Sequence, residues 1–328
     1  MEKKTYYLGI DVGSVSTNLV AADEKGLVSQ KLYLRTGGQP VKVMQEGLDI
    51  MSRRLGNDVN IGGVGATGSG RQLANIIIGA DIVKNEITAH AAASGRTVPG
   101  VRTILEIGGQ DSKIIFLKNG IVHDFAMNTV CAAGTGSFLD RQASRLNIPI
   151  DEFGKYALMS KTPVRIAGRC AVFAESDMIH KQQTGHSIED IIGGLCDAMV
   201  RNYLNNLAKS KVIEEPIVFQ GGVAANVGIV AAFEKALGKK IIIPSHYDVM
   251  GAYGAALLAM EKMSSGKLSS NFYGFEAAKR DYRAKSIECH DCSNLCEIVE
   301  MLSDGEPVAR WGDRCGKWAF VGNKSEAG

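Results

Sequence analysis

Two cysteines of this chain stand in closely matching sequence settings. Cys131 precedes the small-residue run 132–136, and Cys170 precedes the run 171–176. Each run is typical of the start of a helix, where free N–H groups and the helix dipole stabilise a thiolate. Thiolates are the protein ligands of iron–sulfur clusters, and a 4Fe–4S cluster takes four of them. Because one chain offers two such ligands, the pattern predicts one cluster shared by two copies in a symmetric dimer.

Four further cysteines lie together near the C-terminus, and their spacing includes a Cys-x-x-Cys pair: Cys289, Cys292, Cys296 and Cys315. A short polar segment of this kind buries too little apolar surface to fold unaided. We therefore expect a metal site here, formed by Zn²⁺ or a second iron–sulfur cluster, and the alternative is a set of reduced surface thiols. The seventh cysteine, Cys196, lies in an amphipathic helical pattern and is interpreted as a core residue.

Two strand–turn–strand segments share one plan. The first covers residues 6–22 and the second covers 101–117, and both place a Gly-rich turn and an acidic residue between apolar strands. A third strand is expected after each, at 27–35 and at 120–128. We interpret this pattern as an internal duplication that produces two α/β halves facing a cleft.

The two Gly-rich turns suit a nucleotide polyphosphate. Glycine lets backbone N–H groups approach phosphate oxygens, and hydroxyl side chains add donors. We expect Asp11 and Asp111 to hold Mg²⁺ through water, because Mg²⁺ keeps much of its hydration shell. A third element, a strand ending in Gly-Gly within 219–226, leaves a flat surface for an adenosine. The residues expected to bind the nucleotide are Gly13, Ser14, Ser16, Thr17, Gly108, Gly109, Gly221, Gly222, Val223 and Asn226.

Hydrolysis of a bound nucleotide requires a positioned water more than a strong base. The candidates for this role are Asp11, Asp111, Gln110 and Glu86. Glu86 is equally compatible with a solvated or helix-capping carboxylate, and His90, one helical turn later, is interpreted as a satisfied helix residue. Glu175 is interpreted either as a functional residue or as a cap for the helix after Cys170. Near the cysteines, we expect backbone N–H donors close to a sulfur, and the residues that would supply them are Gly134, Thr135 and Gly136.

Apolar spacing and glycine positions predict the elements that hold these residues. Helices are expected at 41–55, 70–79, 81–93, 136–146, 188–208, 224–237 and 251–263, buried strands at 216–220 and 240–243, and a linker at 264–271. We therefore predict three parts: a first half, residues 1–100, completed by about 245–265; a second half, residues 101–244; and a Cys-rich extension, residues 271–328.

Composition favours an ordinary globular enzyme. Of the 328 residues, 45% are hydrophobic and 22% are charged, and the formal net charge of +2 gives no case for nucleic acid or an anionic membrane as a partner. No apolar run approaches the length of a membrane span. The first residues lead directly into a strand pattern without the apolar core of a signal peptide, so a cytoplasmic location is expected.

The order of the two turns and the Gly-Gly element resembles the phosphate and adenosine motifs of the actin/Hsp70/sugar-kinase superfamily. This resemblance implies a duplicated α/β fold of the RNase H-like type. Within that superfamily, residues 6–263 resemble the ATP-dependent activators of 2-hydroxyacyl-CoA dehydratases and benzoyl-CoA reductases. The segments that carry the narrower resemblance are 65–71, 85–91, 128–139 and 170–178.

This resemblance implies that ATP or ADP binds with Mg²⁺ between the two halves, and that a 4Fe–4S cluster bridges a homodimer. The electron would come from a low-potential donor such as ferredoxin or flavodoxin. It would pass to an iron–sulfur acceptor enzyme, either a dehydratase or a double-cubane cluster protein. Two alternatives remain at this point: a small-molecule kinase of the same fold, and a non-catalytic ATP-dependent regulator.

Overall fold

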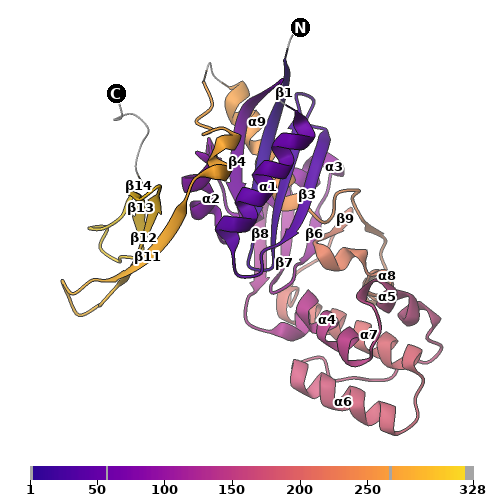
Figure 1. Cartoon of the computed structure of the whole chain (residues 1–328). Helices are drawn as coiled ribbons and strands as arrows, with labels where there is room; N and C mark the ends of the chain where they lie inside the picture. The colour runs from indigo at the N-terminus through magenta and orange to yellow at the C-terminus, as the bar shows by residue number, and fades with distance from the viewer. Residues whose placement is uncertain (1–2, 57, 266–267, 322–328) are drawn as a thin grey trace. The chain divides into compact units, whose positions relative to one another are not determined.

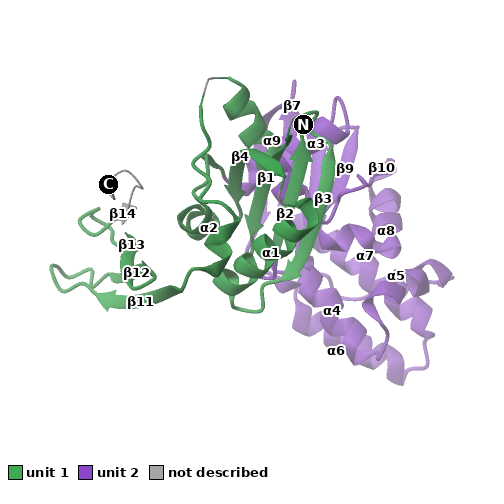
Figure 2. Ribbon diagram, turned by 45° about the horizontal axis from the view of Figure 1, so that its top comes forward, with its two compact units in different colours: residues 1–13, 17–84, 255–328 green, residues 14–16, 85–254 purple. Residues whose placement is uncertain are grey.

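The structure is a computed structural model that describes residues 3–56, 58–265 and 268–321 (Figure 1). The chain divides into two compact units, coloured separately in Figure 2. Unit 1 comprises Met1–Gly13, Thr17–Lys84 and Ala255–Gly328, and unit 2 comprises Ser14–Ser16 and Asn85–Gly254. The boundary at which the chain leaves unit 2 and returns to unit 1 lies inside a helix, α9 (Met250–Ser264).

Unit 1 is built on a five-stranded sheet in the order β3-β2-β1-β4-β5. The central strand β1 pairs antiparallel with β2 and parallel with β4. Its strands are β1 (Lys4–Val12), β2 (Ser16–Asp23), β3 (Val28–Arg35), β4 (Val59–Thr67) and β5 (Ile82–Val83). The helices α1 (Pro40–Leu55) and α2 (Arg71–Ile78) and most of α9 accompany them in this unit.

Unit 2 repeats this plan with the order β10-β9-β6-β7-β8. Its central strand β6 pairs antiparallel with β7 and parallel with β9, as β1 does with β2 and β4. The strands are β6 (Thr103–Ile107), β7 (Ser112–Lys118), β8 (Ile121–Asn128), β9 (Ile217–Gln220) and β10 (Ile241–Ile242). The predicted duplication of an α/β half is therefore confirmed.

The helices of unit 2 hold the cysteine segments. In chain order they are α3 (Glu86–Thr97), α4 (Gly136–Arg145), α5 (Ile150–Met159), α6 (Ala171–Gln183), α7 (Ile188–Leu207) and α8 (Val227–Leu237). The long helix α7 contributes much of the core, and its Tyr203 packs edge-on against Phe233 with ring centroids 5.2 Å apart. None of the helices in the described residues combines the length and apolar character needed to cross a lipid bilayer.

The Cys-rich extension folds as a small antiparallel sheet within unit 1 (Figure 1). Its strands are β11 (Tyr282–Glu288), β12 (Glu297–Ser303), β13 (Glu306–Trp311) and β14 (Phe320–Val321), preceded by the 3₁₀ helix η3 (Phe275–Lys279). Met301 and Ala309 pack against Ile76 of α2, so apolar contacts attach this sheet to the rest of its unit. No sequence pattern had predicted these strands.

The helix predicted at 81–93 is wrong in its first part. Residues 82–83 form strand β5, and α3 begins at Glu86 because Asn85 caps it, accepting the Thr88 N–H at 2.9 Å. The buried Asp81 carboxylate instead accepts backbone N–H groups from Val64 at 2.8 Å and Asn271 at 2.7 Å. Asp81 thereby anchors the end of the predicted linker, of which residues 266–267 lie outside the described residues.

A close approach of α9 to α3 inside unit 2 yields a stability prediction. A Cβ on Gly254 would lie 1.8 Å from the Ala89 carbonyl oxygen, whereas a Cβ on Gly95 of α3 would meet nothing within 4 Å. Both glycines lie in helices, so alanine brings the same gain in helix propensity, about 0.5–1 kcal/mol. We expect Gly95→Ala to raise the melting temperature and Gly254→Ala to lower it, because overpacking costs about 1–3 kcal/mol or more. Equal effects in thermal unfolding would contradict this packing.

Candidate functional site

The first Gly-rich turn joins β1 to β2. The Thr36 hydroxyl donates to the Gly13 carbonyl oxygen at 2.9 Å and lies 3.0 Å from the Thr17 hydroxyl oxygen. Thr17 is fully buried, while Ser14 at the tip of the turn is exposed. The turn is therefore held from beneath by the end of β3, and the hydroxyl that it presents to solvent is that of Ser14.

A second loop, residues 68–70, closes over the end of β1. Gly68 has a φ of +88°, and a Cβ there would lie 2.4 Å from Asp11 Oδ1. The Gly70 N–H donates to the Val12 carbonyl oxygen at 2.8 Å. Because only glycine tolerates both this dihedral and this approach, the loop fixes the position of Asp11 at the strand end.

The second Gly-rich turn joins β6 to β7 in unit 2. Its first N–H, from Gly108, donates to the Asp111 carbonyl oxygen at 3.0 Å, which closes the turn and leaves Gln110 exposed. A Cβ on Gly109 would lie 2.7 Å from Val15, which belongs to the segment 14–16 assigned to unit 2. Glycine is thus required here for close packing.

The start of α4 is bonded directly to this second turn. The N–H groups of Gly136 and Ser137 donate to the carbonyl oxygens of Gly108 at 2.8 Å and Gly109 at 2.9 Å. These two N–H groups belong to the first turn of α4. The N–H groups of a first helical turn have no acceptor within the helix itself. The turn predicted to bind phosphate therefore supplies the acceptors that begin α4.

A buried lysine that the sequence analysis missed brings several candidates together. The Lys113 ammonium lies 2.8 Å from Asp111, 3.0 Å from Glu106 and 3.2 Å from Glu86, measured to carboxylate oxygens. Its side chain is only 2% exposed, compared with 34% for that of Asp111 and 26% for that of Glu86. The cation thus lies beneath two partly exposed carboxylates and orients both of them.

Electrostatics keep this lysine charged. Burial alone would lower the pKa of Lys113, but the three carboxylates, Glu106 foremost, outweigh burial and raise it. Burial raises the pKa of Glu106 to about 8, although Lys113 opposes the shift. Asp111 and Glu86 are the carboxylates of this cluster with access to solvent.

His90 faces away from this chemistry into a buried hydrogen-bond chain. Its Nδ1 lies 2.8 Å from the Gln220 amide nitrogen, and the Gln220 oxygen accepts the Ser94 hydroxyl at 2.8 Å. The interpretation of His90 as a satisfied helix residue is therefore confirmed. Burial, helped by the charge of Lys113, lowers the pKa of His90 from 6.5 to about 3, so the ring stays neutral.

This neutral histidine makes folding sensitive to acid. The unfolded chain gains a proton on His90 below pH 6.5 whereas the native chain does not until about pH 3, so stability present above pH 6.5 is lost as the pH falls. Between pH 6.5 and roughly pH 5 the loss amounts to about 2 kcal/mol. In denaturant melts, His90→Asn should show a flatter pH profile than the wild type. His123→Asn, a control at an exposed position, should leave the profile unchanged, and equal slopes for both variants would contradict the assignment.

The Gly-Gly element follows β9 as predicted. Gly221 has a φ of +88°, and a Cβ there would lie 2.3 Å from the Ile107 carbonyl oxygen, so the backbone crosses the end of β6 closely. Gly222 starts the 3₁₀ helix η2 (Gly222–Ala225), which contains Val223. Asn226 caps α8 by accepting the N–H groups of residues 228 and 229. Its side-chain oxygen is therefore used inside the protein.

The two cysteine segments lie next to each other in unit 2. Cys170 is the N-cap residue of α6, and Cys131 precedes a 3₁₀ helix of three residues, η1 (Ala132–Gly134). The Cys131 sulfur lies 3.8 Å from the Arg169 carbonyl oxygen, the residue before Cys170. The predicted helix start is thus confirmed for Cys170. After Cys131 the predicted helix is only the short turn η1, because α4 begins five residues later.

The N–H groups of Gly134, Thr135 and Gly136 all donate to carbonyl oxygens in this structure rather than to a sulfur. Asn128 fixes the Cys131 segment instead, accepting the Cys131 N–H at 2.9 Å and donating to the Cys131 carbonyl oxygen at 2.8 Å. A single asparagine side chain therefore clamps the cysteine backbone from both sides.

Glu175 joins the helices that follow the two cysteines. Its carboxylate on α6 pairs with Arg141 at 3.0 Å and also with Arg145, both on α4. The side chain is 16% exposed, so solvent screens this pairing less than it screens a surface ion pair. Neither of the two roles considered for Glu175 describes this bridge, which constrains the angle between α4 and α6.

The C-terminal cysteines occupy two loops of the small sheet. Cys289 and Cys296 close the β11–β12 hairpin, where the Cys289 N–H donates to the Cys296 carbonyl oxygen at 2.8 Å. Cys315 lies in the next loop, which is joined to the hairpin by the Lys317–Asp291 ion pair at 2.5 Å. In the residues that the structure describes, no three His, Cys, Asp or Glu side chains gather closely enough to hold a metal ion. A metal site in this extension stays a prediction.

The thiols of Cys131 and Cys170 fit half of the ligand set that a cluster shared by two chains would need. It consists of two partly exposed free thiols on adjacent loops, and two thiolates per chain is the number that a cluster between two copies requires. Cys196 differs from both, because burial raises the pKa of its thiol to about 12 and keeps it unreactive.

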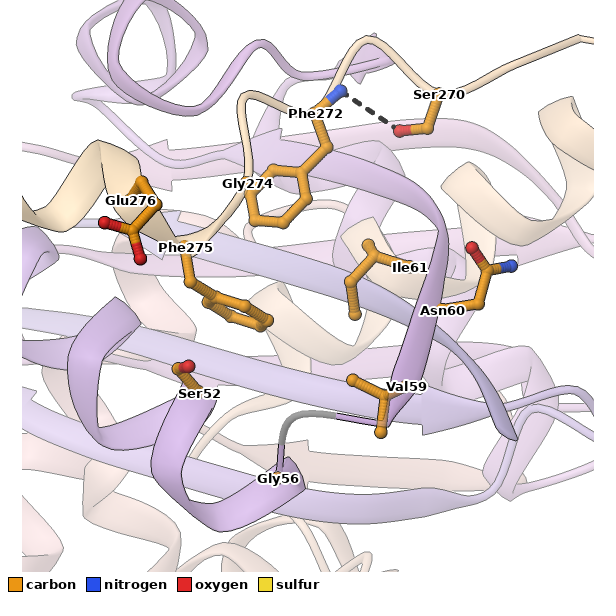
Figure 3. A pocket seen from close by; sticks show the side chains of 10 residues that line it. All are labelled: Ser52, Gly56, Val59, Asn60, Ile61, Ser270, Phe272, Gly274, Phe275 and Glu276. Atoms are coloured by element: carbon orange, nitrogen blue, oxygen red, sulfur yellow. Dashed lines mark hydrogen bonds between the residues drawn. The ribbon is translucent and has the colours of Figure 1, made fainter. Parts of the chain in front are cut away.

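A hollow of about 510 Å³ lies elsewhere, in unit 1 (Figure 3). It is lined by the end of α1, the start of β4 and the segment 270–276, with the rings of Phe272 and Phe275 packed edge-on at 5.4 Å. The residues that the sequence analysis selected do not line this hollow, so it is separate from the predicted nucleotide site.

Comparison with known proteins decides the family. Residues 8–259 match the model of the BadF/BadG/BcrA/BcrD ATPase family. The chain belongs to this family. It is 34% identical over 263 residues to the 2-hydroxyisocaproyl-CoA dehydratase activator of Clostridioides difficile, a match that covers 78% of this chain and 96% of that relative. It is 35% identical over 260 residues to the (R)-2-hydroxyglutaryl-CoA dehydratase activating ATPase of Acidaminococcus fermentans, covering 78% of this chain and 98% of that protein.

Solved structures agree with this membership. The activator of the 2-hydroxyisocaproyl-CoA dehydratase from Clostridium difficile with bound ADPNP superposes with a TM-score of 0.71 at 32% identity, covering 80% of this chain and 97% of that one. The expected resemblance and the actin-like fold are both confirmed. The BadF/BadG/BcrA/BcrD match ends before the Cys-rich extension, which is therefore an addition to the family core.

Proposed function

We propose that this ATPase-family protein is an activator that uses ATP to deliver a low-potential electron to an iron–sulfur partner enzyme. Two copies hold one 4Fe–4S cluster through Cys131 and Cys170 of each. A ferredoxin or flavodoxin supplies the electron, and a 2-hydroxyacyl-CoA dehydratase or a double-cubane cluster protein receives it. The named relatives, which are dehydratase activators, support this assignment.

The observation that carries the proposal is the bonding of α4 to the second Gly-rich turn. The carbonyl oxygens of Gly108 and Gly109 accept N–H groups of α4, and a phosphate would draw the N–H groups of the same turn. A change in the turn between nucleotide states therefore shifts the start of α4 and, through η1, Cys131. Any such difference in contacts biases the conformational equilibrium that the nucleotide controls.

The surface beside the cysteines supports a dimer. Val130 is 94% exposed, and Val172 and Phe173 are 67% and 65% exposed, each within three residues of one of the cysteines. Large apolar side chains grouped in this way are typical of a protein interface. A second copy placed here covers them and brings its own two thiolates.

For the nucleotide chemistry, we assign roles to residues of both Gly-rich turns. Asp11 and Asp111 hold Mg²⁺ through water, and Gln110 at the exposed tip of its turn orients the attacking water. Lys113 positions Asp111 and Glu86 from below. A 4Fe–4S cluster, when bound, supplies one electron at low potential.

Iron stoichiometry after anaerobic purification tests the central claim. We expect Cys131 and Cys170 of two chains to hold about four iron atoms, because four thiolates hold one cluster. Cys131→Ser and Cys170→Ser should each lose these four iron atoms and ATP-dependent electron transfer while the fold is retained. Cys196→Ala is the control, since that thiol lies in the core of unit 2. An iron content equal to that of the wild type in the Cys131→Ser and Cys170→Ser variants would refute the shared cluster.

The C-terminal extension gives a separate metal measurement. We propose that Cys289, Cys292, Cys296 and Cys315 bind one metal ion or cluster per chain. The double variant Cys289→Ser/Cys315→Ser should then lose that zinc or iron and leave the iron held by Cys131 and Cys170 unchanged. Equal zinc and iron in this variant and the wild type would exclude a metal in the extension.

A further inference from the structure

Asn202 on α7 contacts both cysteine segments. Its side chain is buried, with a residue exposure of 4%, and its amide nitrogen lies 2.5 Å from the Gly168 carbonyl oxygen and 3.7 Å from the Cys131 sulfur. The amide oxygen accepts the Asn206 side-chain amide at 3.1 Å. With the oxygen occupied by a donor and the nitrogen facing a carbonyl, the amide has one consistent orientation, and its N–H groups point to the sulfur side.

Two glycines make room for this contact. A Cβ on Gly134 would lie 2.7 Å from the Asn202 side-chain oxygen, and a Cβ on Gly168 would lie 2.9 Å from the Ala198 carbonyl oxygen. Ala198 and Asn202 are one helical turn apart on α7. The Cys131 and Cys170 segments therefore both press against neighbouring turns of the same helix, at positions where a larger residue would push them away.

Other sources of stabilisation for a Cys131 thiolate are weak here. The backbone N–H groups of residues 134–136 are engaged with carbonyl oxygens, and the helix that follows Cys131 has only three residues. Among the described residues, Asn202 is the side chain whose N–H group lies within hydrogen-bond distance of this sulfur.

We propose that Asn202 is a positioning residue for the iron site. It holds the two cysteine segments on α7 and donates an N–H···S hydrogen bond to the Cys131 thiolate. Such a hydrogen bond stabilises the more negative, reduced state and so raises the reduction potential of a cluster bound there. The inference rests on the proposed function, since it concerns the cluster that Cys131 and Cys170 are proposed to hold.

The test compares two variants of the same helix. Asn202→Leu removes the donor with little change in volume, and Asn205→Leu changes an exposed asparagine of the same helix in the same way. In EPR-monitored redox titrations of the dimer, we expect Asn202→Leu to lower the midpoint potential by about 59 mV, the equivalent of a tenfold change for one electron. Asn205→Leu should stay close to the wild type. A potential unchanged in Asn202→Leu would overturn the assignment.

A second variant covers the case in which Asn202→Leu fails to fold. Gly134→Ala displaces the Asn202 amide by steric contact and should shift the potential in the same direction. An unshifted potential in a folded Gly134→Ala dimer would count against the inference. Iron content separates the two proposals: a wild type without shared iron refutes the proposed function, whereas normal iron with an unchanged potential refutes only the role of Asn202.

Discussion

The two hydrogen bonds from α4 to the carbonyl oxygens of Gly108 and Gly109 are the contacts on which the arrangement of unit 2 depends. A helix must find acceptors for its first N–H groups, and α4 finds them in the Gly-rich turn rather than in a capping side chain of its own. A movement of the turn would therefore also move the start of α4 and the Cys131 segment before it. A protein that couples phosphate binding to a thiolate ligand needs such a link.

Helix α7 provides a second connection of this kind. Asn202 contacts the cysteine segments, and its neighbour Tyr203 donates to the Lys113 carbonyl oxygen at 2.5 Å. Lys113 in turn orients Asp111 and Glu86. Adjacent residues of one buried helix thus contact the cysteine segments and the strand that carries Lys113. Glu175 adds a third constraint by pairing α6 with α4.

Local patterns predicted most of the family core, and long-range contacts account for what they missed. Apolar spacing located α1 and α7, and the repeated strand plan predicted the three antiparallel strands of each sheet, β1 to β3 and β6 to β8. Lys113 was not predicted as a buried cation because one of its three carboxylate partners lies on α3, far away in the sequence. The residue pattern of strand β7 itself does not indicate a buried charge. Asn202 lies 71 residues from Cys131, so no spacing rule connects them. The Cys-rich extension was predicted, but its strands were not, because the interpretation of residues 271–328 rested on the cysteines alone.

The attachment of the C-terminal sheet to α2 has a consequence for how this lineage diverges. The relatives named above are matched along 96% or more of their length by only 78% of this chain, so they have no room for an extension of this size. In this chain Met301 and Ala309 cover Ile76, so a polar side chain at position 76 would be buried against the sheet. In chains that carry the sheet, substitutions at these three positions should covary, and this would date the gain of the extension within the family.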